Sequence, residues 1–276
     1  MIHKAKKSLG QNFLKSISVL NRIVGAGEVS KDDIILEIGP GKGILTEKLL
    51  EKSNHVIAIE KDRELFDFLQ NKFSKEIKNK KLILINDDIL KFNFPKMDCE
   101  FFGNYKIIAN IPYNITGAIL KKFLSEKNKP ESMTLMIQKE VAERIMARDG
   151  KESLLSISVK AYGEPKILFR VSRGNFYPPP KVDSAVITIK NISRKLFIEN
   201  NVDEDRFWEI IRTGFAHKRK KLSSNLKNIY DPLSISPLAR GEKAPKTRGV
   251  GGLKDLKNKR AEELTLKDWI DIAKML

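Results

Sequence analysis

The chain has 276 residues, of which 41% are hydrophobic, and a single cysteine, Cys99. This length and composition predict a folded protein with one ordinary domain and a smaller one, rather than a disordered chain. A lone cysteine excludes an intrachain disulfide and a cysteine-based zinc cluster, and no metal site is predicted.

Charge narrows the choice of partner. Lys and Arg number 52 against 35 Asp and Glu, a net charge of +17, which favours nucleic acid before an anionic membrane surface. The basic N-terminus lacks the apolar segment of a signal peptide, and no stretch nears the ~18 apolar residues of a membrane span. We therefore expect a cytoplasmic protein that does not act at a membrane.

The positive charge is concentrated in two blocks, each without an acidic residue. One block lies between Met1 and Gly27. The other lies between Ile211 and Tyr230 and contains Arg212, Lys218, Arg219, Lys220, Lys221 and Lys227. A uniformly solvated surface does not need such blocks, so they are candidate contacts for a polyanion.

Apolar runs of strand length alternate with helical patterns through the first half of the chain. Strands are predicted at Ile34–Ile38, His55–Glu60, Lys81–Ile85, Lys106–Ile111 and Met133–Gln138. Helices are predicted at Ile44–Lys52, Asp62–Phe73 and Gly117–Glu126. This alternation predicts an α/β fold, with a parallel sheet covered on both faces. Two later strands, Lys166–Val171 and Ser184–Lys190, fit a hairpin at the sheet edge.

A glycine-rich turn follows the first predicted strand. Within the run Glu37–Gly43 (EIGPGKG), Gly39 and Gly41 let the backbone turn sharply and approach a ligand closely. Glu60 ends the second strand, 21 residues after Gly39. A carboxylate at that place can accept both hydroxyls of a ribose. The pattern fits several nucleoside cofactors.

Three features bear on which nucleoside it is. A dinucleotide site would want Gly or Ala three residues after Gly41, where Ile44 stands. Pro40 and the Glu37 carboxylate suit S-adenosylmethionine better, because that cofactor carries an ammonium and a sulfonium and no phosphate. Asp88 follows the third strand, where its carboxylate could take an adenine amino group or merely cap a helix.

The run Asn110–Ile115 (NIPYNI) directly follows the apolar stretch of the fourth strand. Asn110 offers a side-chain carbonyl, and the Pro112 segment offers a backbone carbonyl. Together they could accept both N–H groups of an exocyclic amine, while Tyr113 presents a ring face to the base that carries it. Asn and Pro also favour turns, so a strand that simply ends in a turn is the alternative.

The pattern changes at about residue 190. We assign residues 1–190 to a cofactor-binding domain and 191–276 to a small helical domain. Its helices are predicted at Glu204–Phe215, at Leu222 to Ile229, and at Leu264–Met275. The stretch at about 233–252 is basic and rich in Gly and Pro, without apolar periodicity, and is predicted to be a flexible insertion.

Five segments, in this order along the chain, resemble the ribosomal small-subunit (16S) RNA adenine dimethyltransferases, the family whose loss gives kasugamycin resistance. They are Leu9–Leu14 (LGQNFL), Glu37–Thr46 (EIGPGKGILT), Asn110–Ile115 (NIPYNI), Phe176–Val186 (FYPPPKVDSAV) and Phe215–Leu226 (FAHKRKKLSSNL). The match runs from Lys7 to the C-terminus, interrupted only by the insertion. It implies a Rossmann-like methyltransferase sheet and S-adenosylmethionine as the methyl donor.

The resemblance also implies roles around the cofactor. Asn12 and Leu14 would lie over its methionyl part, and Gly39 would contact it from the glycine-rich turn. Glu60 would hold the ribose, and Asp88 the adenine.

The implied target is a pair of adjacent adenines in a 3′-terminal hairpin loop of small-subunit rRNA, each dimethylated at its exocyclic nitrogen. Asn110 would sit between cofactor and target, and Phe176 would sandwich the target base with Tyr113. The helical domain, including Lys218–Lys221, would grip rRNA phosphates. The expected partner is the rRNA itself or an immature small ribosomal subunit, bound by a monomer.

Other functions remain in competition. The macrolide-resistance dimethyltransferases of large-subunit rRNA share a close version of the Asn110 motif, whereas Gly10, Pro40 and the Pro178–Pro180 run with Asp183 favour the small-subunit enzyme. A DNA adenine methyltransferase would want a separate target-recognition region. A non-catalytic rRNA-binding assembly factor would not need the intact site. Ile44 disfavours a nucleotide-dependent oxidoreductase.

Overall fold

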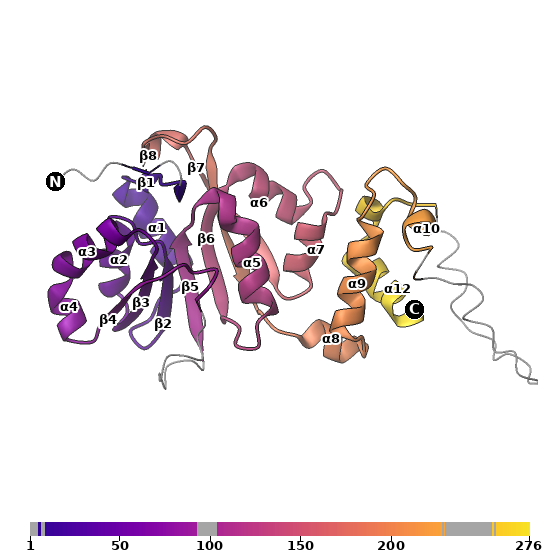
Figure 1. Cartoon of the computed structure of the whole chain (residues 1–276), viewed down its shortest axis with the longest axis horizontal. Coiled ribbons are helices and arrows are strands. Elements are labelled where there is room, and N and C mark those ends of the chain that lie inside the picture. Colours follow the sequence, from indigo (N-terminus) through magenta and orange to yellow (C-terminus); the bar gives the residue numbers. More distant parts are fainter. Residues whose placement is uncertain (1–4, 7–8, 93–103, 228, 230–255, 257) are drawn as a thin grey trace, which may run out of the picture. The chain divides into compact units, whose positions relative to one another are not determined.

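The structure is a computed structural model that describes residues 5–6, 9–92, 104–227, 229, 256 and 258–276 (Figure 1). The predicted insertion at about 233–252, and Cys99, lie outside the described residues. The chain divides into two compact units. Unit 1 comprises Met1–Met146 and Tyr162–Ser193, and unit 2 comprises Ala147–Ala161 and Arg194–Leu276.

Unit 1 contains a seven-stranded sheet in the order β4-β3-β2-β5-β6-β9-β7. The strands are β2 (Ile34–Ile38), β3 (His55–Glu60), β4 (Leu82–Asn86), β5 (Tyr105–Asn110), β6 (Ser132–Gln138), β7 (Glu164–Val171) and β9 (Ser184–Lys190). Strands β2 to β6 pair in parallel, and β9 runs antiparallel between β6 and β7. The predicted parallel sheet and its late antiparallel pair are confirmed, and β9 rather than β7 is the inner strand of that pair.

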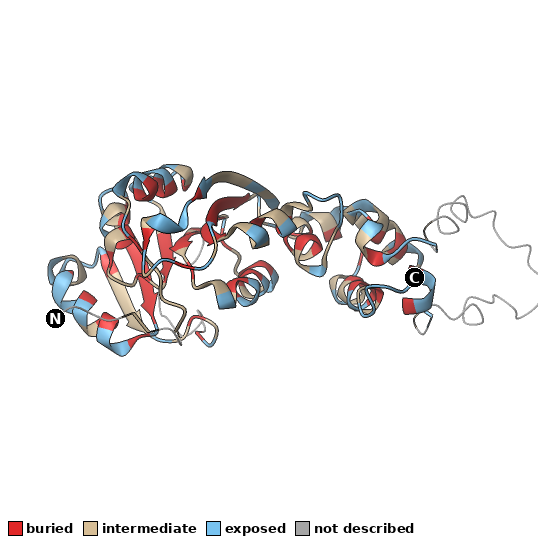
Figure 2. Ribbon diagram, turned by 90° about the horizontal axis from the view of Figure 1, so that it is seen from above, coloured by how far each residue is buried: buried red, intermediate tan, exposed pale blue. Residues whose placement is uncertain are grey.

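Helices cover the sheet. They are α1 (Ile17–Ala26), α2 (Ile44–Leu50), α3 (Arg63–Lys72), α4 (Ser74–Lys78), α5 (Thr116–Ser125) and α6 (Lys139–Met146). A buried cluster joins Leu20 of α1, Leu49 of α2 and Leu69 of α3 to strand residues such as Val56 and Ile108. Strand residues of the opposite register are buried as well, so both faces of the sheet are covered, and Figure 2 shows this burial along the strands.

A two-stranded ribbon that the sequence pattern did not predict joins distant parts of unit 1. Strand β1 (Phe13–Leu14) pairs antiparallel with β8 (Phe176–Tyr177), and the Lys15 N–H donates to the Asn175 carbonyl at 2.8 Å. Because side chains alternate across a strand, Leu14 and Phe176 face the core, while Tyr177 faces outward and is 62% exposed. The ribbon therefore fixes the N-terminal segment to the loop before β9.

Unit 2 is helical. Its helices are α7 (Leu154–Lys160), α8 (Lys195–Asn200), α9 (Glu204–Gly214), α10 (Leu222–Asn225) and α12 (Leu266–Met275). Helices α9 and α12 approach closely at Gly214, where an added Cβ would collide with the buried Trp269 ring. A domain boundary placed only at residue 190 misses α7, which belongs to unit 2. There the Glu152 N–H donates to the Glu262 carbonyl at 2.7 Å.

One predicted helix is much shorter than expected. The apolar spacing from Leu222 to Ile229 suggested two turns, but α10 ends at Asn225. The Asn225 amide donates to the carbonyls of Gly214 (2.6 Å) and His217 (3.1 Å), which ties it to the end of α9. Within the ranges that the structure describes, no helix combines the length and apolar character needed to cross a bilayer.

Candidate active site

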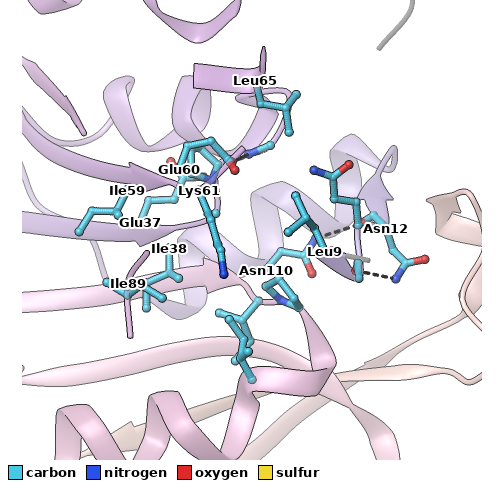
Figure 3. Close-up of a pocket in the computed structure, with 18 of the residues that line it drawn as sticks. Leu9, Asn12, Glu37, Ile38, Ile59, Glu60, Lys61, Leu65, Ile89 and Asn110 are labelled. Atoms are coloured by element: carbon cyan, nitrogen blue, oxygen red, sulfur yellow. Dashed lines mark hydrogen bonds between the residues drawn. The ribbon is translucent and has the colours of Figure 1, made fainter. Parts of the chain in front are cut away.

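A pocket of about 170 Å³ lies at the carboxyl ends of β2, β3, β4 and β5 (Figure 3). Nine of the ten residues predicted for cofactor and target line it: Asn12, Leu14, Gly39, Gly41, Glu60, Asp88, Asn110, Pro112 and Tyr113. In Figure 3, Glu37 and Glu60 lie on one side of the pocket, Asn12 lies on the other, and Asn110 lies between them. Ligands of open α/β sheets bind at this edge.

The glycine-rich turn between β2 and α2 forms the floor of the pocket. Gly41 has a left-handed backbone conformation, with φ at +60°, and an added Cβ would lie 3.1 Å from the Phe13 ring. Gly39 also has a positive φ, and its N–H donates to the Ile59 carbonyl at 2.9 Å. Side chains at these positions would strain the turn and fill space at the pocket floor.

Glu60 is anchored before any ligand arrives. One carboxylate oxygen accepts the Gly41 N–H at 3.0 Å, and the other accepts the Asp62 N–H at 2.8 Å. Burial raises the pKa of Glu60, while these backbone donors oppose the shift. The carboxylate has further lone pairs that could accept ribose hydroxyls.

Glu37, whose carboxylate the sequence pattern already associated with the cofactor, is a second buried carboxyl in the pocket wall. It is 1% exposed, and its Oε2 has no hydrogen-bond partner among the described residues. Burial raises the pKa of Glu37 to about 8, so it carries a proton at neutral pH. An unpartnered buried oxygen is costly, and a donor on a bound ligand would satisfy it.

Asp88 lines the pocket beyond the end of β4. Its carboxylate accepts from Lys61 Nζ at 2.9 Å and from the Leu90 N–H at 3.0 Å. The Lys61 ammonium holds the pKa of Asp88 below its usual range. Asp88 therefore caps the following turn rather than a helix, and it also lines the pocket, where the adenine contact stays a prediction.

The orientation of the Asn110 amide is set by a contact from the N-terminal segment. Asn110 Nδ2 donates to the Asn12 carbonyl at 3.3 Å, and Asn12 Nδ2 donates to the Gly10 carbonyl at 3.2 Å (Figure 3). Because the nitrogen of the Asn110 amide is used in this way, its carbonyl oxygen is the atom left to accept a hydrogen bond from a ligand.

Pro112 and Tyr113 form the turn that follows Asn110. The Pro112 carbonyl accepts the Ile115 N–H at 3.2 Å and has a second lone pair for another donor. Tyr113 is half-buried, and its hydroxyl lies 2.6 Å from Ser184 Oγ. Burial raises the pKa of the Tyr113 phenol, which keeps it neutral. Sequence reasoning missed Ser184, because it stands 71 positions after Tyr113, the residue that it contacts.

Phe176 is the predicted site residue that the structure does not bring to the pocket. Its ring is 1% exposed and belongs to the hydrophobic core cluster, and the residue does not line the cavity. The physical reason is its register in the ribbon, where it pairs with the buried Leu14 on the inward face. In this structure the Phe176 ring belongs to the same buried cluster as Leu14 of the N-terminal segment.

A clasp holds the N-terminal segment over the pocket. Asp62, whose side chain is 1% exposed, accepts from Lys6 Nζ at 2.8 Å and from Gln11 Nε2 at 2.9 Å. Gln11 Oε1 in turn accepts the Lys6 N–H at 2.8 Å. Although burial raises the pKa of Asp62, the hydrogen bonds from Lys6 and Gln11 bring it below its usual value. Asp62 follows Glu60 by two residues, so the clasp adjoins the ribose candidate.

The predicted phosphate-binding residues lie in unit 2. Arg212 is exposed on α9, and Lys218, Arg219, Lys220 and Lys221 are exposed in the segment that follows. Lys221 Nζ donates to Asn258 Oδ1 at 3.2 Å. The structure thus gathers these five cations within one unit, on α9 and the segment before α10.

Comparison with known proteins places the chain in a family. A family model described as ribosomal RNA adenine dimethylase matches residues 2–273. A ribosomal RNA small subunit methyltransferase A from Dehalococcoides mccartyi is 42% identical over 272 residues, covering 96% of this chain and 86% of that protein.

Solved structures agree with the family model. The crystal structure of a dimethyladenosine transferase from Plasmodium falciparum is 30% identical, with a TM-score of 0.74, covering 94% of this chain and 95% of that one. The crystal structure of the 23S rRNA methyltransferase ErmE, 24% identical with a TM-score of 0.72, shares the fold over 96% of this chain and 99% of its own. The chain therefore belongs to the ribosomal RNA adenine dimethylase family, among the small-subunit rRNA adenine dimethyltransferases.

Proposed function

We propose that this protein uses S-adenosylmethionine to dimethylate the N6 amines of two adjacent adenines in the 3′-terminal hairpin loop of small-subunit rRNA. It acts in the cytoplasm as a monomer, on an immature small ribosomal subunit. The observation that carries the proposal is the orientation of Asn110, whose carbonyl oxygen is left to accept from a ligand at the pocket edge. The names of the relatives support the rRNA substrate.

The hydrogen-bond acceptors of the pocket fit the donors of the cofactor. Glu60 offers carboxylate lone pairs for ribose hydroxyls, and the unpartnered Glu37 oxygen offers an acceptor for the cofactor's ammonium. The turn at Gly41 leaves open the space that a Cβ would occupy. When bound, S-adenosylmethionine supplies an electrophilic methyl group on a sulfonium, whose leaving group is a neutral thioether.

The protein's main task is to prepare the nucleophile. The lone pair of an adenine amine is conjugated with the ring and donates poorly. Acceptance of its two hydrogens by Asn110 Oδ1 and a backbone carbonyl near Pro112 would turn the nitrogen toward a tetrahedral shape. Such positioning can contribute up to ~7–11 kcal/mol in well-oriented systems.

The remaining contacts hold the base and remove the proton. A base must be unpaired or extruded to enter the pocket, and stacking on Tyr113 would contribute ~1–3 kcal/mol. After transfer the nitrogen is cationic and acidic, so it loses its proton to solvent without a strong general base. The second transfer finds a single N–H to hold, so the pocket must let the first methyl group rotate aside.

The basic cluster of unit 2 supplies the electrostatic part of RNA binding. We expect Lys218–Lys221 to contact phosphates, because counterion release then makes binding depend on salt. Replacing these four residues by Gln should lower the slope of log K against log salt by about 3. Replacing four other exposed lysines, Lys31, Lys52, Lys75 and Lys78, is the matched control. An equal change of the slope in both variants would show that Lys218–Lys221 do not contact the RNA.

The decisive experiment supplies radiolabelled S-adenosylmethionine with immature small subunits, with large subunits, and with naked rRNA. Nucleoside mass spectrometry should find N6,N6-dimethyladenosine in the small-subunit sample, and the Asn110→Ala variant should leave it unmodified. Label in the large subunit would favour the macrolide-resistance reaction. RNA binding without any methyl transfer would indicate a non-catalytic assembly factor.

A further inference from the structure

Ser184 is a buried hydroxyl that does not line the pocket. It is the first residue of β9, where its backbone pairs with Gln138 of β6 on one side and Val171 of β7 on the other. Its side chain is 0% exposed. Strands on both sides hold the backbone, so Ser184 Oγ is a fixed point of the sheet.

Tyr113, the partner of Ser184, lies outside that sheet. Tyr113 begins the short 3-10 helix η3 (Tyr113–Ile115), which follows β5. If only its Cα end were held, its ring could occupy more than one staggered rotamer of the first side-chain torsion. The hydroxyl at the other end of the ring lies 2.6 Å from Ser184 Oγ, so the ring is held at both ends.

We propose that Ser184 is a positioning residue, whose hydroxyl sets the angle of the Tyr113 ring and thereby the plane in which the target base stacks. The inference rests on the proposed function, since it concerns how the adenine is presented to the methyl donor. The Tyr113–Ser184 hydrogen bond joins β9 to the turn after β5, which contains the residues proposed to hold the adenine.

Asp183, the residue before Ser184, also holds the start of β9 by hydrogen bonds. Asp183 Oδ1 accepts the Arg173 N–H at 3.0 Å, and the Asp183 carbonyl accepts the Lys139 N–H at 3.0 Å. Arg173 begins the turn that leads into β8, the partner of the N-terminal segment. The start of β9 therefore holds both the ring beneath the target base and the ribbon beside the cofactor pocket.

The test compares two ways of breaking one bond. Ser184→Ala and Tyr113→Phe should each lower kcat/KM for the rRNA substrate about 3- to 10-fold, the range of one neutral hydrogen bond. The affinity for S-adenosylmethionine should stay within twofold. The double variant should be no worse than the poorer single variant, because both remove the same interaction.

A matched control lies on the same strand. Thr188 of β9 is 4% exposed, and its hydroxyl has no hydrogen-bond partner among the described residues. Thr188→Val therefore removes a buried hydroxyl from β9 without touching Tyr113, and its kcat/KM should equal that of the unchanged protein.

A second readout reports the stacking itself. An RNA hairpin with 2-aminopurine at the target position should lose fluorescence when the base stacks on Tyr113, and Ser184→Ala should weaken this quenching at saturating protein. The proposal is overturned if Ser184→Ala leaves both kcat/KM and quenching unchanged, or if the effects of the two single variants multiply. If the unchanged protein transfers no methyl group to rRNA, the proposed function fails instead, and quenching alone then decides the role of Ser184.

Discussion

Two walls of the same pocket are built in different ways. The sheet wall consists of pocket residues from 37–45, 59–61, 87–90 and 110–115, at the ends of neighbouring strands of one sheet. The N-terminal wall is the single segment 9–14, held by the β1–β8 ribbon and the Asp62 clasp. We infer that the sheet wall binds the cofactor's ribose and prepares the nucleophile, and that the N-terminal wall, which orients the Asn110 amide, also slows release of the bound cofactor.

The largest effect is expected at the end of β5. Asn110→Ala should lower the single-turnover rate of methyl transfer about 100- to 1,000-fold, comparable to losing one preorganised donor or acceptor at a reacting centre. Cofactor affinity should change little, because Glu60 and the glycine-rich turn are untouched. Rapid-quench measurement with labelled cofactor checks this. A loss smaller than tenfold would show that Asn110 does not prepare the nucleophile for methyl transfer.

A pH dependence is expected from Glu37 in the same wall. Burial raises its pKa from 4.5 to about 8, so between these values the folded protein holds a proton that the unfolded chain releases. The free energy of unfolding should therefore fall as pH rises, by roughly 2–3 kcal/mol between pH 5 and pH 7 from this group.

Glu37→Gln, which keeps the shape without titrating, should flatten that pH dependence. Urea denaturation at pH 5, 6 and 7 compares the two proteins. Parallel curves for the variant and the unchanged protein would show that Glu37 does not hold the extra proton.

A smaller effect is expected at Glu60. Glu60→Gln should weaken S-adenosylmethionine binding about 10- to 30-fold, because the amide keeps one acceptor and presents a donor to the hydroxyl pair. Calorimetry measures the affinity, with Glu51→Gln as the control, since that residue lies outside the cofactor pocket and its side chain is 55% exposed. An affinity equal to the unchanged protein would remove Glu60 from the ribose site.

The smallest effect is expected from the N-terminal wall. Asp62→Asn keeps a side chain that can cap α3 but loses the ionic contact with Lys6, so cofactor release should speed up about 3- to 10-fold while the transfer step stays the same. Stopped-flow displacement measures release. Asp67→Asn, which removes an exposed pair with Arg63 on the same helix, is the control. An equal rate for both variants would show that the clasp does not retain the cofactor.

The same contrast explains what could be predicted from the sequence. The five parallel strands, and the residues at their ends such as Glu60 and Asn110, could be predicted because each rests on a local pattern. The β1–β8 ribbon could not, because it pairs Phe13 with Tyr177 through two residues per strand. The roles of Ser184 and Asp62 could not be predicted for the same reason, since they depend on partners distant in sequence. The buried position of Phe176 could not be predicted from its motif, because it depends on the pairing with Leu14 in the ribbon.

Methyl transfer by this protein requires that the strand ends bring a methyl donor and an extruded adenine face to face beside Asn110. The most direct measurement is a crystal structure of the protein soaked with S-adenosylmethionine. We expect the ribose at Glu60, the ammonium near Glu37, and the methyl group directed toward Asn110 Oδ1. Density for the cofactor elsewhere, or none at saturating concentration, would contradict the account.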